Sequence, residues 1–152
     1  MQVIKPESAN QIPNGKTKIF LAGSIEMGTA EDWQTKLENL LVEDDVTIFN
    51  PRRNDWDSSW IQRISNPQFN YQVNWELDRL EQADVIFMYF APDTKSPISL
   101  LELGAFSHKR IIVCCPDGFW RKGNIEIYCN RNFIPLFDNF DDATQYLFKT
   151  IK

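Results

Sequence analysis

The sequence lacks the features that several protein classes require. Its 152 residues contain no run near the roughly 18 apolar residues that span a bilayer, so no membrane is expected as a partner. Residues 1–16 also lack the apolar segment of a secretory signal peptide. There is one histidine, His108, and the three cysteines form no Cys-Xaa-Xaa-Cys pair, so we expect no metal and no other cofactor. An odd number of cysteines does not make a disulfide framework, which favours a reducing, cytoplasmic setting.

Positive charge is scarce as well. There are 16 Lys and Arg against 21 Asp and Glu, which gives a net charge of −5. Binding to a nucleic-acid backbone needs clustered Lys and Arg, so polymeric nucleic acid is not expected as a partner. The sequence contains neither a Gly-Xaa-Gly-Xaa-Xaa-Gly fingerprint nor a P-loop, which disfavours dinucleotide and Walker-type nucleotide binding.

Aromatic residues, in contrast, are abundant. They make up 13% of the chain and include five Trp, which require a deep core or a functional surface. Residues 1–16 are polar and contain two prolines, so we interpret them as a tail or a surface arm. Residues 17–152 have the length of a single domain.

From residue 17 onward, short apolar runs alternate with helical patterns, which is typical of βαβ units. This alternation predicts an α/β fold, a flavodoxin-like, doubly wound, mostly parallel sheet of five strands with helices on both faces. Pro135 places the last strand at an edge. The expected strands are 17–22, 46–49, 85–90, 111–115 and 133–137, and the expected helices are 30–43, 67–82, 97–108 and 141–152.

Doubly wound sheets bind ligands beyond the carboxyl ends of their strands. This rule selects residues 23–28, 50–60, 91–96 and 116–124. The connections 50–66 and 116–131 are also long for loops of this class, and long loops in compact domains are often functional.

Two of these stretches carry candidate binding residues. Gly23 lets a ligand approach the backbone and Ser24 offers a hydroxyl, although a plain β-to-α turn would have the same residues. Arg52 and its neighbour Arg53 could bind phosphate or order the loop through Asp, and Trp56 could stack on a base or cover the core.

Two helices carry candidate catalytic carboxylates. Asp78 shares a face of the helix 67–82 with Trp75 and could orient a sugar hydroxyl, with Gln72 beside it, but periodicity alone favours a solvated face. Glu102 lies in an otherwise apolar helix, where it must be paired, protonated or functional unless it points outward. Glu102 is therefore a candidate nucleophile or acid–base group.

Together these pieces resemble the nucleoside 2-deoxyribosyltransferase superfamily, and most closely its nucleoside 2-deoxyribosyltransferase-like branch. The resemblance runs in chain order from about residue 17 to 130. The segments that carry it are 19–25 (IFLAGSI) with Trp33 and Gln34, 50–53 (NPRR) with Trp56, 72–78 (QVNWELD) leading to Ala83 and Asp84, 96–104 (SPISLLELG), and 119–124 (FWRKGN).

The resemblance implies an enzyme that transfers a 2-deoxyribosyl group between nucleobases with retention of configuration. Glu102 matches the family's nucleophile, which forms a covalent glycosyl-enzyme, and Asp78 would assist at the base or sugar. Asn124 matches a loop Asn that often contacts the substrate of a neighbouring subunit, which implies a homo-oligomer, a dimer or larger, with shared active sites. The expected substrates are deoxynucleosides and nucleobases.

The match departs from the family at the loop before the nucleophile. Better-known members have an Asp-Xaa-Gly-Thr-like stretch there, and Asp93 could replace its Asp. Related N-hydrolases of deoxynucleoside 5′-monophosphates hold phosphate with two serines, whose positions Ser24 and Ser96 match. Glu26 would repel that phosphate, which favours free nucleosides. The alternatives are an N-glycoside hydrolase of deoxynucleosides or their 5′-monophosphates, and a catalytically silent nucleoside-binding module.

Overall fold

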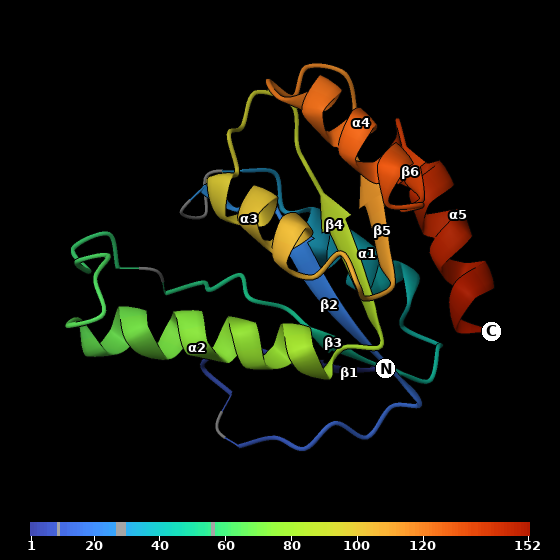
Figure 1. Ribbon diagram of the computed structural model, residues 1–152. Helices are drawn as coiled ribbons and strands as arrows, with labels where there is room; N and C mark the ends of the chain where they lie inside the picture. Colours follow the sequence, from blue (N-terminus) through green and yellow to red (C-terminus); the bar gives the residue numbers. More distant parts are fainter. Residues whose placement is uncertain (9, 27–29, 56) are drawn as a thin grey trace.

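A computed structural model describes residues 1–8, 10–26, 30–55 and 57–152. Its centre is a six-stranded sheet in the order β1-β3-β2-β4-β5-β6, in which all neighbouring strands are parallel (Figure 1). The strands are β1 Gln2–Ile4, β2 Thr17–Gly23, β3 Val46–Phe49, β4 Val85–Tyr89, β5 Ile111–Cys114 and β6 Leu136–Phe137. The helices are α1 Trp33–Leu40, α2 Pro67–Gln82, α3 Pro97–Ala105, α4 Lys122–Arg131 and α5 Phe140–Ile151.

Helices cover both faces of the sheet, which confirms the predicted doubly wound α/β fold. Alternate residues of a strand point to opposite faces, so β2 sends Phe20 to one core cluster and Leu21 to the other. The Phe20 cluster includes residues of α2, α3 and α4, whereas the Leu21 cluster includes residues of α1 and α5. Burial on both faces explains why β4 is an unbroken apolar run.

The sixth strand was not expected from the sequence. Residues 2–4, in the stretch interpreted as a tail or arm, form β1 and pair with β3 along the edge of the sheet. Ile4 is fully buried, and the Gln2 side chain accepts hydrogen bonds from Asn14 N and Thr47 Oγ1, both at 3.0 Å. A strand of three residues is too short to show an alternating pattern in the sequence. It can be recognised only from its pairing with β3.

The segment after β5 also differs from the expectation. Residues 116–131 were expected to be a long loop, but their second half is α4. Ile125 and Cys129 are its buried residues, spaced four apart as in any helix that packs on one side. The predicted strand 133–137 is reduced to β6, which lies at the edge of the sheet as Pro135 indicated.

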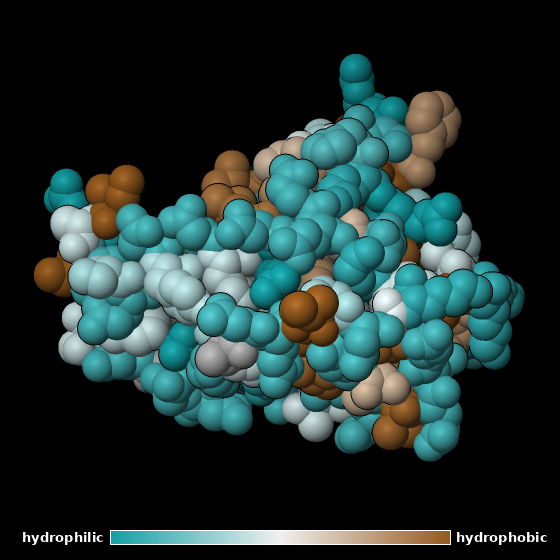
Figure 2. Space-filling model, turned by 90° about the horizontal axis from the view of Figure 1, so that it is seen from below, coloured by the Kyte–Doolittle hydropathy of each residue, from teal (hydrophilic) through white to brown (hydrophobic). Residues whose placement is uncertain are grey.

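The surface of the molecule is largely polar and its cysteines lie in the core. The face seen from below in Figure 2 is mostly hydrophilic, with apolar side chains scattered over it. All three cysteines are buried and free. Within the part of the chain that the structure describes, no helix is both long enough and apolar enough to cross a membrane.

The strand order defines where the sheet can bind a ligand. The chain leaves β2 through α1 towards β3 on one side, and α2 then returns it to β4 on the other side. The carboxyl ends of β2 and β4 therefore form the topological switch point, the usual ligand position in open α/β sheets. The candidate site is built around these two strand ends.

Candidate active site

Gly23 is required by the close approach of two strands. It ends β2 with a φ of +134°, and a Cβ atom there would lie 2.8 Å from Tyr89 N and closer still to Tyr89 O. Only glycine adopts this backbone conformation without strain. From the sequence, a ligand was expected to approach the backbone at Gly23. In the structure the neighbouring strand β4 makes this close approach.

A cluster of three hydroxyl groups joins the loops after β2 and β4. The Oγ of Ser24 accepts a hydrogen bond from Ala91 N at 2.9 Å and lies 2.8 Å from Thr94 Oγ1 and 2.7 Å from Ser96 Oγ. Thr94 Oγ1 and Ser96 Oγ are themselves 3.1 Å apart. Ser24 and Ser96 are buried, so their hydroxyls hold the two loops together at the switch point.

A carboxylate from the chain occupies the N-terminus of α3. The Oε1 atom of Glu26 accepts hydrogen bonds from the backbone N–H groups of Lys95 and Ser96, each at 3.0 Å. Ser96 precedes the helix with a φ of +44° and makes no side-chain capping bond. The partial positive charge of a helix N-terminus favours an anion, and Glu26 supplies one.

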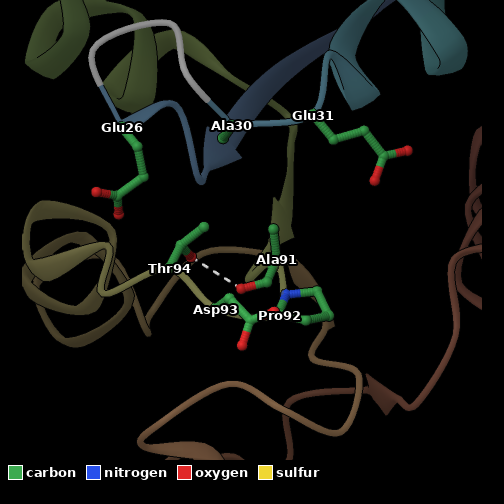
Figure 3. A pocket seen from close by; sticks show the side chains of 7 residues that line it. All are labelled: Glu26, Ala30, Glu31, Ala91, Pro92, Asp93 and Thr94. Carbon is green, nitrogen blue, oxygen red and sulfur yellow. Dashed lines mark hydrogen bonds between the residues drawn. The ribbon is translucent and has the colours of Figure 1, made fainter.

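An open pocket of about 470 Å³ lies beside Glu26 at this edge of the sheet (Figure 3). Its size is within the range of small-molecule sites. Asp93 is at its rim, exposed and with a φ of +61°. The described residues that line it are Glu26, Ala30, Glu31, Ala91, Pro92, Asp93 and Thr94.

Glu102 is a buried carboxylate on α3. Only 9% of the residue is exposed, and its Oε2 atom has no hydrogen-bond partner among the described residues. Burial, together with the charge of the nearby Glu76, raises the pKa of Glu102 to about 8. A buried carboxylate oxygen without a partner is costly, which is typical of a functional group rather than a structural one.

Glu76, on α2, is the second carboxylate of this region. The Nε2 atom of Gln72 donates a hydrogen bond to Glu76 Oε1 at 2.7 Å. Burial raises the pKa of Glu76 to about 7, and the Gln72 hydrogen bond limits the rise. Both carboxyl groups therefore have pKa values close to neutral pH, where each can hold or release a proton.

The sequence pattern of α2 pointed to Asp78, whereas the structure points to Glu76. The two residues lie about 200° apart around the helix axis, so they point to opposite sides. Asp78 is exposed, and Glu76 is the carboxylate whose charge acts on Glu102. The spacing of Gln72 and Glu76, one helical turn, is the signal that could have identified this pair.

The loop after β3 reaches the carboxylates through Gln72. This buried side chain also donates to Pro51 O at 3.2 Å, and its Oε1 atom accepts from Arg53 Nη1 at 3.1 Å. Arg53 pairs with Asp55 at 3.0 Å and lies over the Trp60 ring. Arg53 and Gln72 thus hold Glu76 in one orientation from outside.

Other predicted site residues lie elsewhere. Arg52 donates to the backbone oxygens of Glu31 and Ala30 at 2.9 and 2.7 Å, so it orders the loop before α1. Trp75 is buried and packs near Phe20 in the core. Asn124 is exposed in the first turn of α4, and Trp56 lies outside the described residues.

The carboxylate pair predicts how stability depends on pH. Between about pH 5 and 8 the folded protein keeps protons on Glu76 and Glu102 that the unfolded chain has released, so the free energy of unfolding should fall with rising pH. Each pKa unit corresponds to about 1.4 kcal/mol, so the fall should reach a few kcal/mol. Urea unfolding at several pH values measures it.

The variant Glu102→Gln provides the control for this pH effect. Glutamine does not titrate, so the variant should lose a smaller part of its stability over the same pH range. The other carboxyl groups with shifted pKa values are shifted downward, below this window. A wild-type stability that stays level or rises from pH 5 to 8 would contradict the assignment.

Comparison with known proteins identifies a family and several similar solved structures. Residues 16–119 match the family described as nucleoside 2-deoxyribosyltransferase like. The structure of a 2-deoxyribosyltransferase from the psychrotolerant bacterium Bacillus psychrosaccharolyticus is 22% identical, with a TM-score of 0.59 over 88% of this chain and 95% of its own. That of a CMP N-glycosidase from Clostridium botulinum is 17% identical, with a TM-score of 0.48 over 88% and 96%. The first likeness supports the shared fold, and no curated protein sequence matches.

Proposed function

Because the chain belongs to the nucleoside 2-deoxyribosyltransferase-like family, we propose that it cleaves the N-glycosidic bond of 2-deoxynucleosides and transfers the deoxyribosyl group to a second nucleobase. Glu102 is the nucleophile in this proposal. The observation that carries it is the buried Glu102 carboxylate, which has an unpartnered oxygen on the helix that follows the central strand β4.

The first step forms a covalent intermediate. A carboxylate oxygen of Glu102 attacks the anomeric carbon, and the bond from that carbon to the base nitrogen breaks. The electron pair of the broken bond stays on the base, which takes a proton from Glu76. The products of this step are the free base and an ester between Glu102 and deoxyribose.

The second step reverses the first with a different base. A nitrogen of the incoming base attacks the anomeric carbon, its proton returns to Glu76, and Glu102 leaves as a carboxylate. Two inversions at one carbon give overall retention, as in other retaining glycosyl transfers.

Burial raises the pKa of both carboxyl groups towards neutral pH, so each of them can hold or release a proton there. Glu102 attacks after it has given up its proton, and Glu76 then donates one to the leaving base. The sugar gains positive charge in the transition state, and that charge is stabilised by the Glu102 carboxylate beside it. A 2-deoxy sugar suits this chemistry because no 2-hydroxyl withdraws electrons from the developing cation.

The remaining predicted residues have supporting roles in the proposal. Gln72 and Arg53 hold Glu76, whereas Gly23, Ser24 and Ser96 shape the switch point. Asp93, exposed at the pocket rim, can accept a hydrogen bond from a sugar hydroxyl.

Incubation with thymidine and adenine tests the proposed function. Transfer gives deoxyadenosine and thymine, which chromatography separates. Release of thymine without any deoxyadenosine would show that water, not a base, resolves the intermediate. Thermal stabilisation by thymidine without any product would show a binding module and overturn the proposal.

We extend the proposal to a homo-oligomer. The outer side of α3 is apolar, with Ile98 59% and Leu101 67% exposed. Tyr128 on α4 reaches Gly104 O at 3.5 Å, and α4 itself exposes Ile127. Adjacent exposed apolar side chains on two packed helices favour a second copy of the chain as the covering surface.

The variant Leu101→Lys tests this surface. We expect the wild type to be a dimer or larger and the variant to shift to monomer, because a charge would be buried in the interface. Size-exclusion chromatography with light scattering measures both masses. Leu40→Lys, a similar change at a half-exposed position of α1, should leave the mass unchanged. A monomeric wild type would refute the interface.

A further inference from the structure

The N-terminus of α3 lies within reach of the 5′ end of a nucleoside bound at Glu102. Ser96 precedes Glu102 by six residues, which is about 9 Å along the helix axis. Side chains on a helix lean toward its N-terminus, so the carboxyl group of Glu102 lies closer to Ser96 along the axis than the Glu102 backbone does. The unpartnered Glu102 oxygen indicates that the ligand belongs on this side of the helix.

Glu26 already takes the hydrogen bonds that an anion would use there. Both N–H groups at the start of α3, those of Lys95 and Ser96, donate to the same Glu26 oxygen at 3.0 Å. Figure 3 shows the Glu26 side chain extending from the loop after β2 toward the loop that carries Thr94. A phosphate would have to displace this carboxylate and then remain beside its negative charge.

The groups around Glu26 do not compensate a phosphate. The three hydroxyls that could donate to one, on Ser24, Thr94 and Ser96, are hydrogen-bonded to each other. The charged side chains among the described residues that line the pocket are all acidic, namely Glu26, Glu31 and Asp93.

Two cationic side chains of the neighbouring segments, Lys95 and Arg52, already interact with other groups of the protein. The Lys95 ammonium group lies over the Trp120 ring, 5.4 Å from its centre. Arg52 donates to backbone oxygens of Ala30 and Glu31 at the pocket wall. An acidic pocket of this kind suits a neutral, hydroxyl-rich ligand and disfavours a dianion.

We propose that Glu26 is the specificity-determining residue of this site, whose carboxylate occupies the position of a substrate 5′-phosphate and so restricts the enzyme to unphosphorylated deoxynucleosides. This inference rests on the proposed function and adds to it the residue that selects the substrate.

Turnover of thymidine and thymidine 5′-monophosphate, each with adenine, provides the first test. The wild type should prefer the nucleoside by at least about tenfold in kcat/KM, and Glu26→Gly should reduce that preference at least about tenfold. Glycine suits this position because Glu26 has a φ of +46°. A wild type that uses both substrates equally, or a smaller change in the variant, would overturn the proposal.

Two further variants separate position from charge. Glu31→Gln removes one charge from the same pocket and leaves the Lys95 and Ser96 N–H groups occupied, so it should leave the preference largely in place. Glu26→Gln removes the charge but keeps a side chain in position, so its effect should fall between those of Glu31→Gln and Glu26→Gly. An effect of Glu31→Gln as large as that of Glu26→Gly would also overturn the proposal.

A binding measurement tests Glu26 independently of catalysis. Inorganic phosphate should raise the melting temperature of Glu26→Gly and leave that of the wild type unchanged, at equal ionic strength with chloride as the reference. Equal responses of the two proteins would refute the role of Glu26 even if thymidine is turned over. If no substrate is turned over but phosphate stabilises only the variant, the proposed function fails and the assignment of Glu26 stands.

Discussion

Replacing Glu102 with Gln is expected to lower the rate of deoxyribosyl transfer at least about 1,000-fold, because an amide does not form the glycosyl ester. The change keeps the size of the side chain and removes a buried carboxylate that lacks a hydrogen-bond partner. The variant should therefore fold and, at pH 8, be at least as stable as the wild type. Initial rates of deoxyadenosine formation from thymidine and adenine measure the loss.

Mass spectrometry of the protein adds a direct reading of the intermediate. The wild type mixed with thymidine alone should gain the mass of one deoxyribosyl group, and Glu102→Gln should gain none. A Glu102→Gln variant with an undiminished rate would rule out this residue as the nucleophile.

A paired comparison on α2 decides which carboxylate assists Glu102. Glu76→Gln should reduce the transfer rate about 100-fold or more, the usual range for a general acid or base. Asp78→Asn makes the same kind of change on the exposed side of the helix and should have the smaller effect. The reverse order would restore Asp78 to the role that the family resemblance suggested.

Replacing Gly23 with Ala is expected to lower the free energy of unfolding by roughly 4 kcal/mol or more, at the upper end of single-residue effects. The added Cβ would overlap the backbone of Tyr89, and β2 and β4 are paired there, so neither strand can move away alone. The φ of +134° adds strain to any side chain. Urea or thermal unfolding measures the change.

The matched control is Gly123→Ala, in the first turn of α4. No atom lies within 4 Å of a Cβ built there. Alanine is the better helix former, so the change should be neutral or stabilise the protein by up to about 1 kcal/mol. Similar stability of the Gly23 and Gly123 variants would show that the two strands do not approach as closely as described.

Much of the fold could be predicted because its signals are local. The unbroken apolar run of β4, the Asn66 cap with Pro67, and the alternation of strands and helices all depend on neighbours in the sequence. Asn66 Oδ1 accepts from Phe69 N at 2.9 Å, as that cap requires. β1 and α4 were missed because each shows few buried residues, and their places depend on β3 and on the core.

The site was only partly predictable for the same reason. Glu102 stands out in the sequence because a carboxylate in an apolar helix is costly wherever that helix packs. Glu76 does not stand out, since its helix is mostly polar and only its burial and its electrostatic effect on Glu102 distinguish it from Asp78. Arg52 and Arg53 are adjacent in the sequence, yet one orders a loop and the other reaches Gln72.

The sequence by itself therefore determined the fold class, the family and one catalytic candidate, because hydrophobic periodicity and a short motif are local properties of the chain. Only the tertiary structure decided that Glu76 lies near enough for its charge to act on Glu102 and that Glu26 lies on the N-terminus of α3. Glu76 and Glu102 are 26 residues apart in the sequence, and Glu26 and Ser96 are 70 residues apart. The order of the strands in the sheet brings each pair together.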